Sequence, residues 1–359
     1  MTPNRRDFLK TAASLAAAAF VPFQVTPTRP VQRRQVSIGN RRIKVVDIHG
    51  HFIAPEELEL IKDTNLAGNI SNQMNGPLVL GPERLRTLDE RGIDVQALSH
   101  QGGWWYKTDR ELARRLIKVQ NERLAEWCRA HADRFVGLAS VALQHPDLAS
   151  QQLEEAVKTF GFRGVGIAGH AGGEVQSAPK YDPFWAKAQE LGVVVFVHPG
   201  GAENVLQEGA LSGRGDLANI IGNPLETTVF LSRMIFDGTL DRFPDLRIIG
   251  AHAGGYLPSY MGRTDVACEV RPGANCANKK SPREYFKQQI LVDSMALTAE
   301  GLRHLVAEVG AGHVVYGTDI PFNWPTTVDL ILGASFLSNA EKESILGGTL
   351  TKLLHLAAK

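Results

Sequence analysis

The sequence predicts an α/β protein built as a (β/α)8 TIM barrel. Along the 359 residues, eight short runs rich in β-branched and apolar residues alternate with amphipathic stretches. The length also suits one barrel, since a single barrel commonly runs to roughly 250 residues or more. A doubly wound open sheet is the alternative architecture. It is disfavoured because the chain contains neither the G-x-G-x-x-G nor the G-x-x-x-x-G-K-[ST] nucleotide-binding motif.

The beginning of the chain reads as an export signal. Arg5 and Arg6 precede the sequence Asp-Phe-Leu-Lys, and the stretch from Thr11 through Thr28 then contains no charged residue. A basic start followed by a short Ala-rich apolar segment is the order of a signal peptide, and paired arginines are typical of the twin-arginine (Tat) pathway. An N-terminal amphipathic helix that stays attached is the alternative.

This leader predicts a division of the chain into two segments and a location for the mature protein. We expect residues 1–30 to be a Tat-type signal peptide and residues 31–359 to be a single barrel. The Tat export machinery would then be a partner, and the mature protein would be periplasmic or otherwise extracytoplasmic.

Composition and charge exclude several other classes of protein. The chain has 39 Lys and Arg against 38 Asp and Glu, a formal net charge of +1, so we expect no nucleic-acid partner. Three cysteines are too few for a disulfide scaffold. Cys268 and Cys276 lie close together and could pair in an oxidising compartment, or could remain two free thiols.

The barrel strands are predicted from the eight apolar runs. These are Ile43–His49, Asp94–Ser99, Phe135–Val141, Gly164–Ala168, Val193–His198, Arg247–His252, Ile290–Asp293 and His313–Thr318. Several are continuously apolar, as expected for parallel strands that are buried on both faces.

The intervening amphipathic stretches predict helices. They are Asp109–His131, Leu148–Phe160, Asp182–Leu191, Leu225–Phe243 and Thr298–Val309. Asn223 and Ser281 each precede a proline, so both are predicted as N-caps. Two long connections, Phe52–Pro82 and Pro199–Gly222, follow the first and fifth strands, where barrels build their pockets.

Residues of metal-binding type stand at the ends of four predicted strands. His49 and His51 are two residues apart on one strand, so both side chains point the same way. His198, His252 and Asp319 end three further strands. Strand ends of a barrel converge on one face, which predicts a metal site there. A hydrogen-bonded core histidine is the alternative for any one of them, but not for the whole set.

The order of these motifs resembles the amidohydrolase superfamily, in the branch similar to aminocarboxymuconate-semialdehyde decarboxylase. The motifs are DIHGHF (47–52), LDERGIDVQALS (88–99), GVGIAGH (164–170), VFVHP (195–199), AHAGGYLPSYMGRTD (251–265), VDS (292–294) and YGTDIPF (316–322). The resemblance implies that His49, His51, His198 and Asp319 bind one zinc ion per subunit, with another divalent metal as the alternative. It also implies that His252 and Asp319 are the catalytic residues.

The same resemblance implies how a small carboxylate substrate is bound. Arg263 matches an arginine that recognises a carboxylate, sometimes across a subunit interface, which implies a homodimer. His170 and Trp104 are further substrate-facing candidates, with structural roles as the alternative.

The fourth strand ends in Ala-Gly-His without the lysine of binuclear relatives, which favours one metal ion. Asp47 is expected to lie below the metal, as support for a ligand or as an acid of the barrel core, and Asp293 is expected to have a structural hydrogen-bonding role.

The resulting functional hypothesis is an exported, metal-dependent, non-hydrolytic decarboxylase (a carboxy-lyase) of a small aromatic or unsaturated carboxylic acid. A zinc-dependent hydrolase of a lactone, ester or amide is the alternative, because the same residues would serve it. A catalytically inactive extracytoplasmic binding protein is the third hypothesis. The cavity-lining loops decide among them, and their contacts cannot be read from sequence.

Overall fold

The computed structural model describes residues 32–357 apart from 65, 68–75, 103 and 203. The chain separates into the units Met1–Gln32 and Arg33–Lys359. The predicted signal peptide, residues 1–30, lies outside the described residues. Among the helices that are described, none is both long and apolar enough to cross a membrane.

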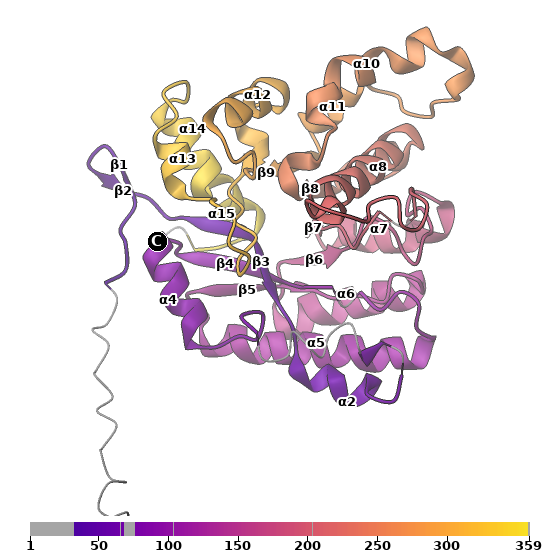
Figure 1. Ribbon diagram of the computed structural model, residues 1–359, viewed down its shortest axis with the longest axis horizontal. Coiled ribbons are helices and arrows are strands. Elements are labelled where there is room, and N and C mark those ends of the chain that lie inside the picture. The colour runs from indigo at the N-terminus through magenta and orange to yellow at the C-terminus, as the bar shows by residue number, and fades with distance from the viewer. Residues whose placement is uncertain (1–31, 65, 68–75, 103, 203, 358–359) are drawn as a thin grey trace, which may run out of the picture. The chain divides into compact units, whose positions relative to one another are not determined.

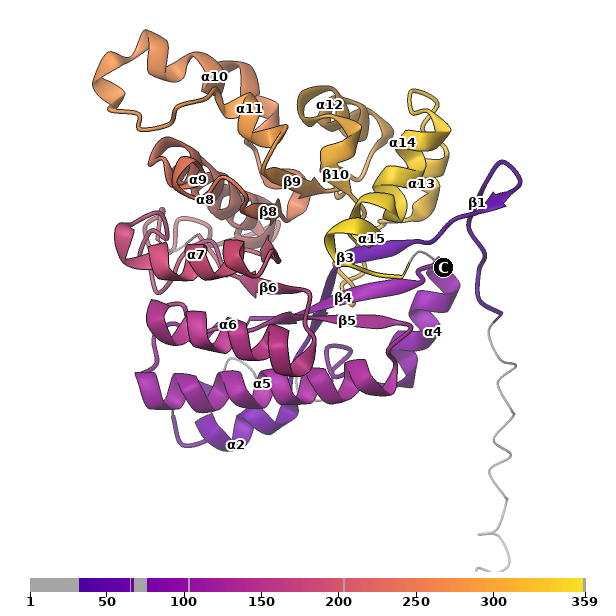
Figure 2. The same cartoon turned by 180° about the vertical axis from the view of Figure 1, so that it is seen from behind.

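Eight parallel strands form one sheet, which confirms the predicted fold class. In chain order they are β3 (Val46–Phe52), β4 (Val95–His100), β5 (Phe135–Ala139), β6 (Gly164–Ile167), β7 (Val194–Val197), β8 (Arg247–Gly250), β9 (Ile290–Asp293) and β10 (Val314–Val315). Neighbours in the sheet follow chain order from β3 to β10. Figures 1 and 2 show the strands side by side with helices on the outside.

Hydrogen bonds join the first strand to the chain that follows the last one. Ile48 N–H donates to the Tyr316 carbonyl over 3.0 Å, and His51 N–H donates to the Ile320 carbonyl over 2.8 Å. These bonds also explain a correction at the first strand. It was expected to end at His49, but β3 continues to Phe52 because its far end pairs with both β4 and the segment after β10.

The predicted helices are present, with one interruption. They correspond to α5 (Arg110–Ala130), α6 (Pro146–Phe160), α7 (Asp182–Glu190), α8 (Asn223–Phe236), α9 (Thr239–Arg242) and α12 (Ala299–Val309). The single helix expected over Leu225–Phe243 is divided into α8 and α9. Gly238 lies between them with φ +69°, a left-handed conformation that ends a helix.

Several short elements were not predicted from the sequence. They are the hairpin β1 (Ser37–Ile38) and β2 (Arg41–Arg42), and the helices α2 (Leu58–Ile61), α4 (Pro82–Arg91), α10 (Met261–Val270), α13 (Val328–Leu332), α14 (Asn339–Glu343) and α15 (Thr349–Leu353), whereas α11 (Pro282–Phe286) begins where Ser281 and Pro282 predicted a helix start. Most of them are too short to show a helical repeat in the sequence.

The two predicted N-caps have different outcomes. Ser281 caps α11, and its N–H donates to Glu284 Oε2 over 2.8 Å in a capping box. Asn223 does not cap α8, because a π-helical turn, Ala218–Gly222, leads directly into the helix. The backbone is already helical at Gly222, so Asn223 continues the helix instead of starting it.

The barrel interior is filled by alternate residues of the strands. Val46 and Ile48 of β3 meet Phe196 of β7 and Ile249 of β8 in one buried cluster, which Leu350 of α15 joins. Each such side chain contributes about 1.5–3 kcal/mol when fully buried. The Phe196 ring lies 5.0 Å from the His49 ring, centroid to centroid. This apolar cluster therefore lies beneath the histidines.

Candidate metal centre and active site

The strand ends bring His49, His51, His198 and Asp319 together. One ligand-type atom of each lies within 4.8 Å of the others, and all four side chains are buried. Two belong to β3, one directly follows β7, and Asp319 stands four residues after the end of β10. These are the four residues that the sequence motifs grouped as ligands.

The unpaired atoms of this group fit a divalent cation. Nε2 of His49, Nε2 of His51 and Oδ1 of Asp319 are buried without a hydrogen-bond partner in the described part of the chain. Buried polar atoms are normally paired, so a convergent unpaired set indicates a missing positive partner. The Asp319 Oδ1 atom lies 3.2 Å from His49 Nε2 and 3.0 Å from His51 Nε2. Imidazole nitrogens with one carboxylate suit zinc and similar transition metals.

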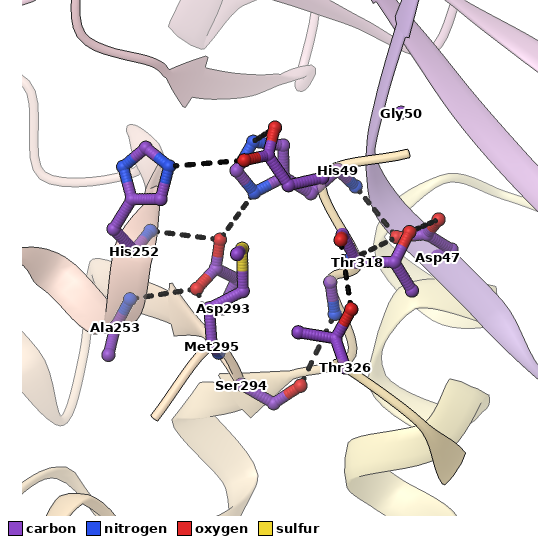
Figure 3. A network of polar contacts seen from close by, with 12 residues as sticks. Asp47, His49, Gly50, His252, Ala253, Asp293, Ser294, Met295, Thr318 and Thr326 are labelled. Atoms are coloured by element: carbon purple, nitrogen blue, oxygen red, sulfur yellow. Dashed lines mark hydrogen bonds and ion pairs between the residues drawn. The ribbon is translucent and has the colours of Figure 1, made fainter. Parts of the chain in front are cut away.

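Asp293 at the end of β9 orients His49. Its Oδ2 atom lies 2.7 Å from His49 Nδ1 and accepts a hydrogen bond from the His252 N–H over 3.0 Å. Its Oδ1 atom accepts from the Ala253 N–H over 2.8 Å, and Figure 3 shows how the carboxylate spans both neighbours. With its Nδ1 atom bonded to Asp293, His49 directs its Nε2 atom toward the metal-binding group.

Asp47 is a buried carboxylate of β3 that connects this strand to its two neighbours. It accepts hydrogen bonds from the His49 N–H over 2.9 Å, from Gln96 Nε2 over 2.7 Å and from Thr318 Oγ1 over 2.6 Å. These partners lie on β3, on β4 and just after β10, as Figure 3 shows for His49 and Thr318. The buried carboxylate thereby fixes the first metal-binding strand against both of its neighbours.

Burial and charge set the protonation of the metal-binding group. Burial lowers the pKa of His51 to about 4 and also lowers the pKa of His198. Burial opposes a charge on His49 as well, but Asp319 and Asp293 outweigh it and raise the pKa of His49 to about 10. Burial opposes ionisation of Asp319, but His49, His252 and His51 outweigh it and hold the pKa of Asp319 well below its usual range. An ionised Asp319 beside neutral His51 and His198 suits a bound metal, and His49 must release its second proton to act as a ligand as well.

His252 faces this group from the end of β8. Its Nε2 atom lies 3.7 Å from Asp319 Oδ2, a contact drawn in Figure 3. The backbone from His252 to Gly255 has positive φ at every residue, a conformation that costs roughly 1–3 kcal/mol for a residue other than glycine. A Cβ atom at Gly255 would lie 2.3 Å from the Pro224 carbonyl oxygen, so this tight turn requires glycine.

A cavity of about 360 Å³ opens above these side chains. Its lining is polar and aromatic, made of Gln101, His198, Asp216, Asn219, Asn223, His252, Asp319, Phe322, Asn323 and Trp324. A neighbouring cleft of about 700 Å³ shares Asp216, Asn219 and Asn223 with it. The long connection after the fifth strand therefore builds a pocket wall, as expected.

Sequence reasoning did not identify the amide and aromatic residues of this cavity. They lie on irregular loops, where side-chain direction has no period that could be read in advance. One signal was available in the sequence. Asp319 and Phe322 share the motif YGTDIPF, and Trp324 follows two residues after it, so this loop could have been assigned to the cavity.

The three predicted substrate residues lie outside the lining of this cavity. Trp104 and His170 line a separate pocket of about 160 Å³. His170 Nε2 donates to the Gly201 carbonyl over 3.2 Å, and its Nδ1 accepts from the Gly173 N–H over 2.9 Å. Arg263 is exposed on α10 and lines neither of these two spaces. Their roles in substrate binding remain predictions.

Comparison with known proteins places these observations in a family. A profile described as Amidohydrolase matches residues 46–356, and a TAT (twin-arginine translocation) pathway signal sequence profile matches residues 2–22. The 2-amino-3-carboxymuconate-6-semialdehyde decarboxylase of Dictyostelium discoideum is 31% identical over 76% of this chain and 76% of its own length. The gamma-resorcylate decarboxylase of Rhodococcus jostii (strain RHA1) is 29% identical over 77% of this chain and 88% of its own length.

Solved structures agree with this sequence similarity. The dihydroxybenzoic acid decarboxylase of Polaromonas sp. JS666, crystallised with bound manganese, has a TM-score of 0.75 and 25% identity, and the match covers 88% of this chain and 97% of that one. Because the Amidohydrolase profile spans most of the sequence and these relatives cover most of both chains, the protein belongs to the amidohydrolase family.

Proposed function

We propose that the protein is an exported, metal-dependent decarboxylase that releases carbon dioxide from a small aromatic or unsaturated carboxylic acid. The observation that carries this proposal is a buried set of three histidines and one aspartate at the base of a cavity that His252 also lines. Sequence relatives that are themselves decarboxylases support it.

The chemistry required is loss of a carboxyl group and delivery of a proton. A divalent cation held by His49, His51, His198 and Asp319 would supply Lewis-acid stabilisation of negative charge on the substrate oxygens. The bond from the carboxyl carbon to its neighbour breaks, and the electron pair stays on that neighbouring carbon, which must then accept a proton. Asp319 and His252 face each other in the cavity and are the groups that hold and move this proton.

The cavity wall suits a ring that carries polar substituents. Phe322 and Trp324 offer aromatic surface on one loop, while Gln101, Asn219 and Asn223 offer neutral amide groups. A planar acid could therefore pack against the aromatic residues and direct its oxygens toward the amides and the metal ligands.

The metal ion is proposed at one per subunit. We predict zinc from the ligand types, and manganese is the competing candidate because it occupies the related Polaromonas enzyme. Both ions accept this mixture of imidazole and carboxylate. Elemental analysis of protein purified from its native compartment decides between them.

The compartment is proposed to be the periplasm. The signal profile at residues 2–22 indicates Tat export. Cys268 and Cys276 form a disulfide, the alternative that the sequence left open. Disulfides persist in oxidising compartments, so this bond agrees with a location outside the cytoplasm.

A homodimer is proposed from an exposed face around α10. Val266 and Val270 are 46% and 62% exposed, and Tyr260 just before the helix is 61% exposed. Arg263 lies among them and would reach a carboxylate in the partner subunit. Light scattering tests the dimer, and Arg263→Ala would raise KM for the acid with little change in metal content.

Product analysis tests the proposed reaction. The metal-loaded protein without its leader would be given gamma-resorcylate and other aromatic acids, and in parallel small lactones and esters. We expect carbon dioxide release that disappears in Asp319→Asn and persists in Asp147→Asn, an exposed control with the same chemical change. Ring opening or ester cleavage without carbon dioxide would replace the decarboxylase with a hydrolase. Binding without any turnover would support the inactive binding protein.

A further inference from the structure

Glu226 is a buried carboxylate beside the active site that the proposed chemistry does not use. It lies on α8, is 1% exposed, and accepts two backbone hydrogen bonds. Oε1 accepts from the Gly169 N–H over 2.7 Å, and Oε2 accepts from the Gly201 N–H over 2.6 Å. Two short hydrogen bonds therefore attach the backbone of both residues to this one side chain.

The two donors belong to neighbouring loops at the mouth of the barrel. Gly169 follows β6, and Gly201 stands three residues after the metal-binding candidate His198. A Cβ atom at Gly169 would lie 2.8 Å from Glu226 Cγ and 2.9 Å from Oε1. The close approach of the carboxylate therefore requires glycine at this position, which makes the contact specific.

The loop held at Gly201 also forms substrate-cavity walls. Gly201 lines the larger cleft, and the same connection carries Asp216 and Asn219, which line both that cleft and the cavity above the metal site. The Gly201 carbonyl accepts from His170, and a Cβ atom at Gly200 would lie 3.2 Å from Trp104 Cδ1. Releasing Gly201 would therefore disturb the cavity wall and the neighbouring pocket together.

His198 itself is held independently of Glu226. Its N–H donates to the Ile167 carbonyl over 2.9 Å, within the pairing of β7 and β6. Loss of the Glu226 contact should therefore affect the substrate wall more than the metal ligand.

We propose that Glu226 is a positioning residue that fixes the loops after β6 and β7 against each other and so sets the shape of the substrate cavity. This inference rests on the proposed function only in the choice of reaction used to measure KM. Its structural part concerns the two loops and stands apart from that reaction.

Glu226→Gln is the first test. The new amide group cannot accept a hydrogen bond where a carboxylate oxygen did, so one backbone N–H loses its partner. We expect KM to rise by roughly tenfold or more, with kcat changed less and metal content unchanged. Hydrogen exchange should become faster in residues 168–173 and 199–206.

Gly169→Ala tests the same contact from the other side. Its Cβ atom would displace the carboxylate, so KM and exchange should change in the same direction as in Glu226→Gln. The double variant should be little worse than either single variant, because both remove one interaction. Additive effects on KM would contradict a shared contact.

Asp94→Asn is the matched control. Asp94 is also a buried carboxylate, and it accepts the Val45 N–H over 2.8 Å just before the start of β3, at the far end of the strands from the metal site. We expect this variant to lower stability without raising KM. If Glu226→Gln changes stability as the control does, with KM and loop exchange at wild-type values, Glu226 is structural only and the proposal is wrong.

Failure of the proposed reaction would be recognised separately. If the wild-type protein releases no carbon dioxide from any acid, the affinity for benzoate replaces KM as the measure of the cavity. A weaker benzoate affinity and faster loop exchange in Glu226→Gln would then still support the positioning role. Unchanged values of both would overturn it.

Discussion

At the scale of single residues, His49 depends on a partner outside the ligand set. Its Nδ1 atom lies 2.7 Å from Asp293 Oδ2, and the same carboxylate also accepts the backbone N–H groups of His252 and Ala253. Asp293 therefore connects the orientation of a metal ligand to the strained turn that presents His252. A change at Asp293 should reach both the metal and the proton-handling residue.

Asp293→Asn should weaken metal binding. The amide offers one acceptor oxygen in place of two, so it cannot serve both His49 and the turn at His252. Loss of such a supporting group typically costs about 10–100-fold in metal affinity. Chelator competition with zinc measures the change.

Asp329→Asn is the control for this change, because Asp329 pairs with Arg34 at the surface. It should leave the zinc affinity unaltered. Equal affinities for Asp293→Asn and the wild type would show that His49 is oriented by its strand alone.

At the scale of elements, a buried glutamate holds the first two loops of the barrel together. Glu57 ends a short 3₁₀ turn, Pro55–Glu57, after β3. Its carboxylate accepts from Trp105 Nε1 over 2.8 Å and from Gln120 Nε2 over 2.6 Å, and it also contacts His100 Nε2. These partners come from β4, the loop after it and α5, so one side chain joins several elements that carry the mouth of the barrel.

Glu57 should make stability depend on acid pH. Burial opposes its ionisation, but His100 and the other hydrogen-bond donors outweigh burial and lower the pKa of Glu57. The unfolded chain therefore takes up this proton first, near pH 4.5, as pH falls. The stabilisation is present above that pH and is lost as pH falls through the lower, folded-state pKa.

Glu57→Gln measures this contribution. We expect a loss of about 3 kcal/mol in the free energy of unfolding at pH 7, because bonds to a buried charge are broken. The difference from wild type should shrink below pH 4.5 in urea unfolding. The exposed neighbour Glu59, which pairs with Lys62, supplies the control Glu59→Gln. A difference that stays constant with pH would mean that Glu57 is not ionised in the folded protein.

At the scale of the whole molecule, the leader and the barrel have separate roles. The TAT signal sequence profile matches residues 2–22, while the barrel unit Arg33–Lys359 contains every residue of the candidate site. Tat export carries folded proteins, so the metal ligands would be assembled before the chain leaves the cytoplasm. Export and metal binding can therefore be separated by mutation.

Replacing Arg5 and Arg6 together by lysine should abolish export and leave the enzyme intact. The paired arginines are the recognised feature of this signal, whereas the charge is retained in the variant. Cell fractionation should find the protein in the cytoplasm, with metal content and activity after purification unchanged. Arg29→Lys is the control within the same segment. Normal export of the double-lysine variant would assign the leader to another pathway.

The fold class and the ligand-type residues could be predicted from the amino-acid sequence. Alternating apolar runs and amphipathic stretches report burial directly, because a buried parallel strand must be apolar on both faces. His49 and His51 could be paired in advance since side chains two apart on a strand share a face. Some element boundaries could not be predicted from the sequence. The apolar pattern continues through Gly238, but this residue is left-handed and ends the helix there.

The surroundings of the ligands, in contrast, depend on contacts that form in the folded protein. Glu226 and Trp324 gain their neighbours from elements far apart in the chain, and no periodic pattern in the sequence relates a helix or loop residue to a partner on another loop. The same holds for Arg263, which the structure places on an exposed helix away from the cavity. Local sequence fixes the direction of a side chain on a strand, whereas contacts between loops exist only once the barrel has folded and brought its strand ends to one face.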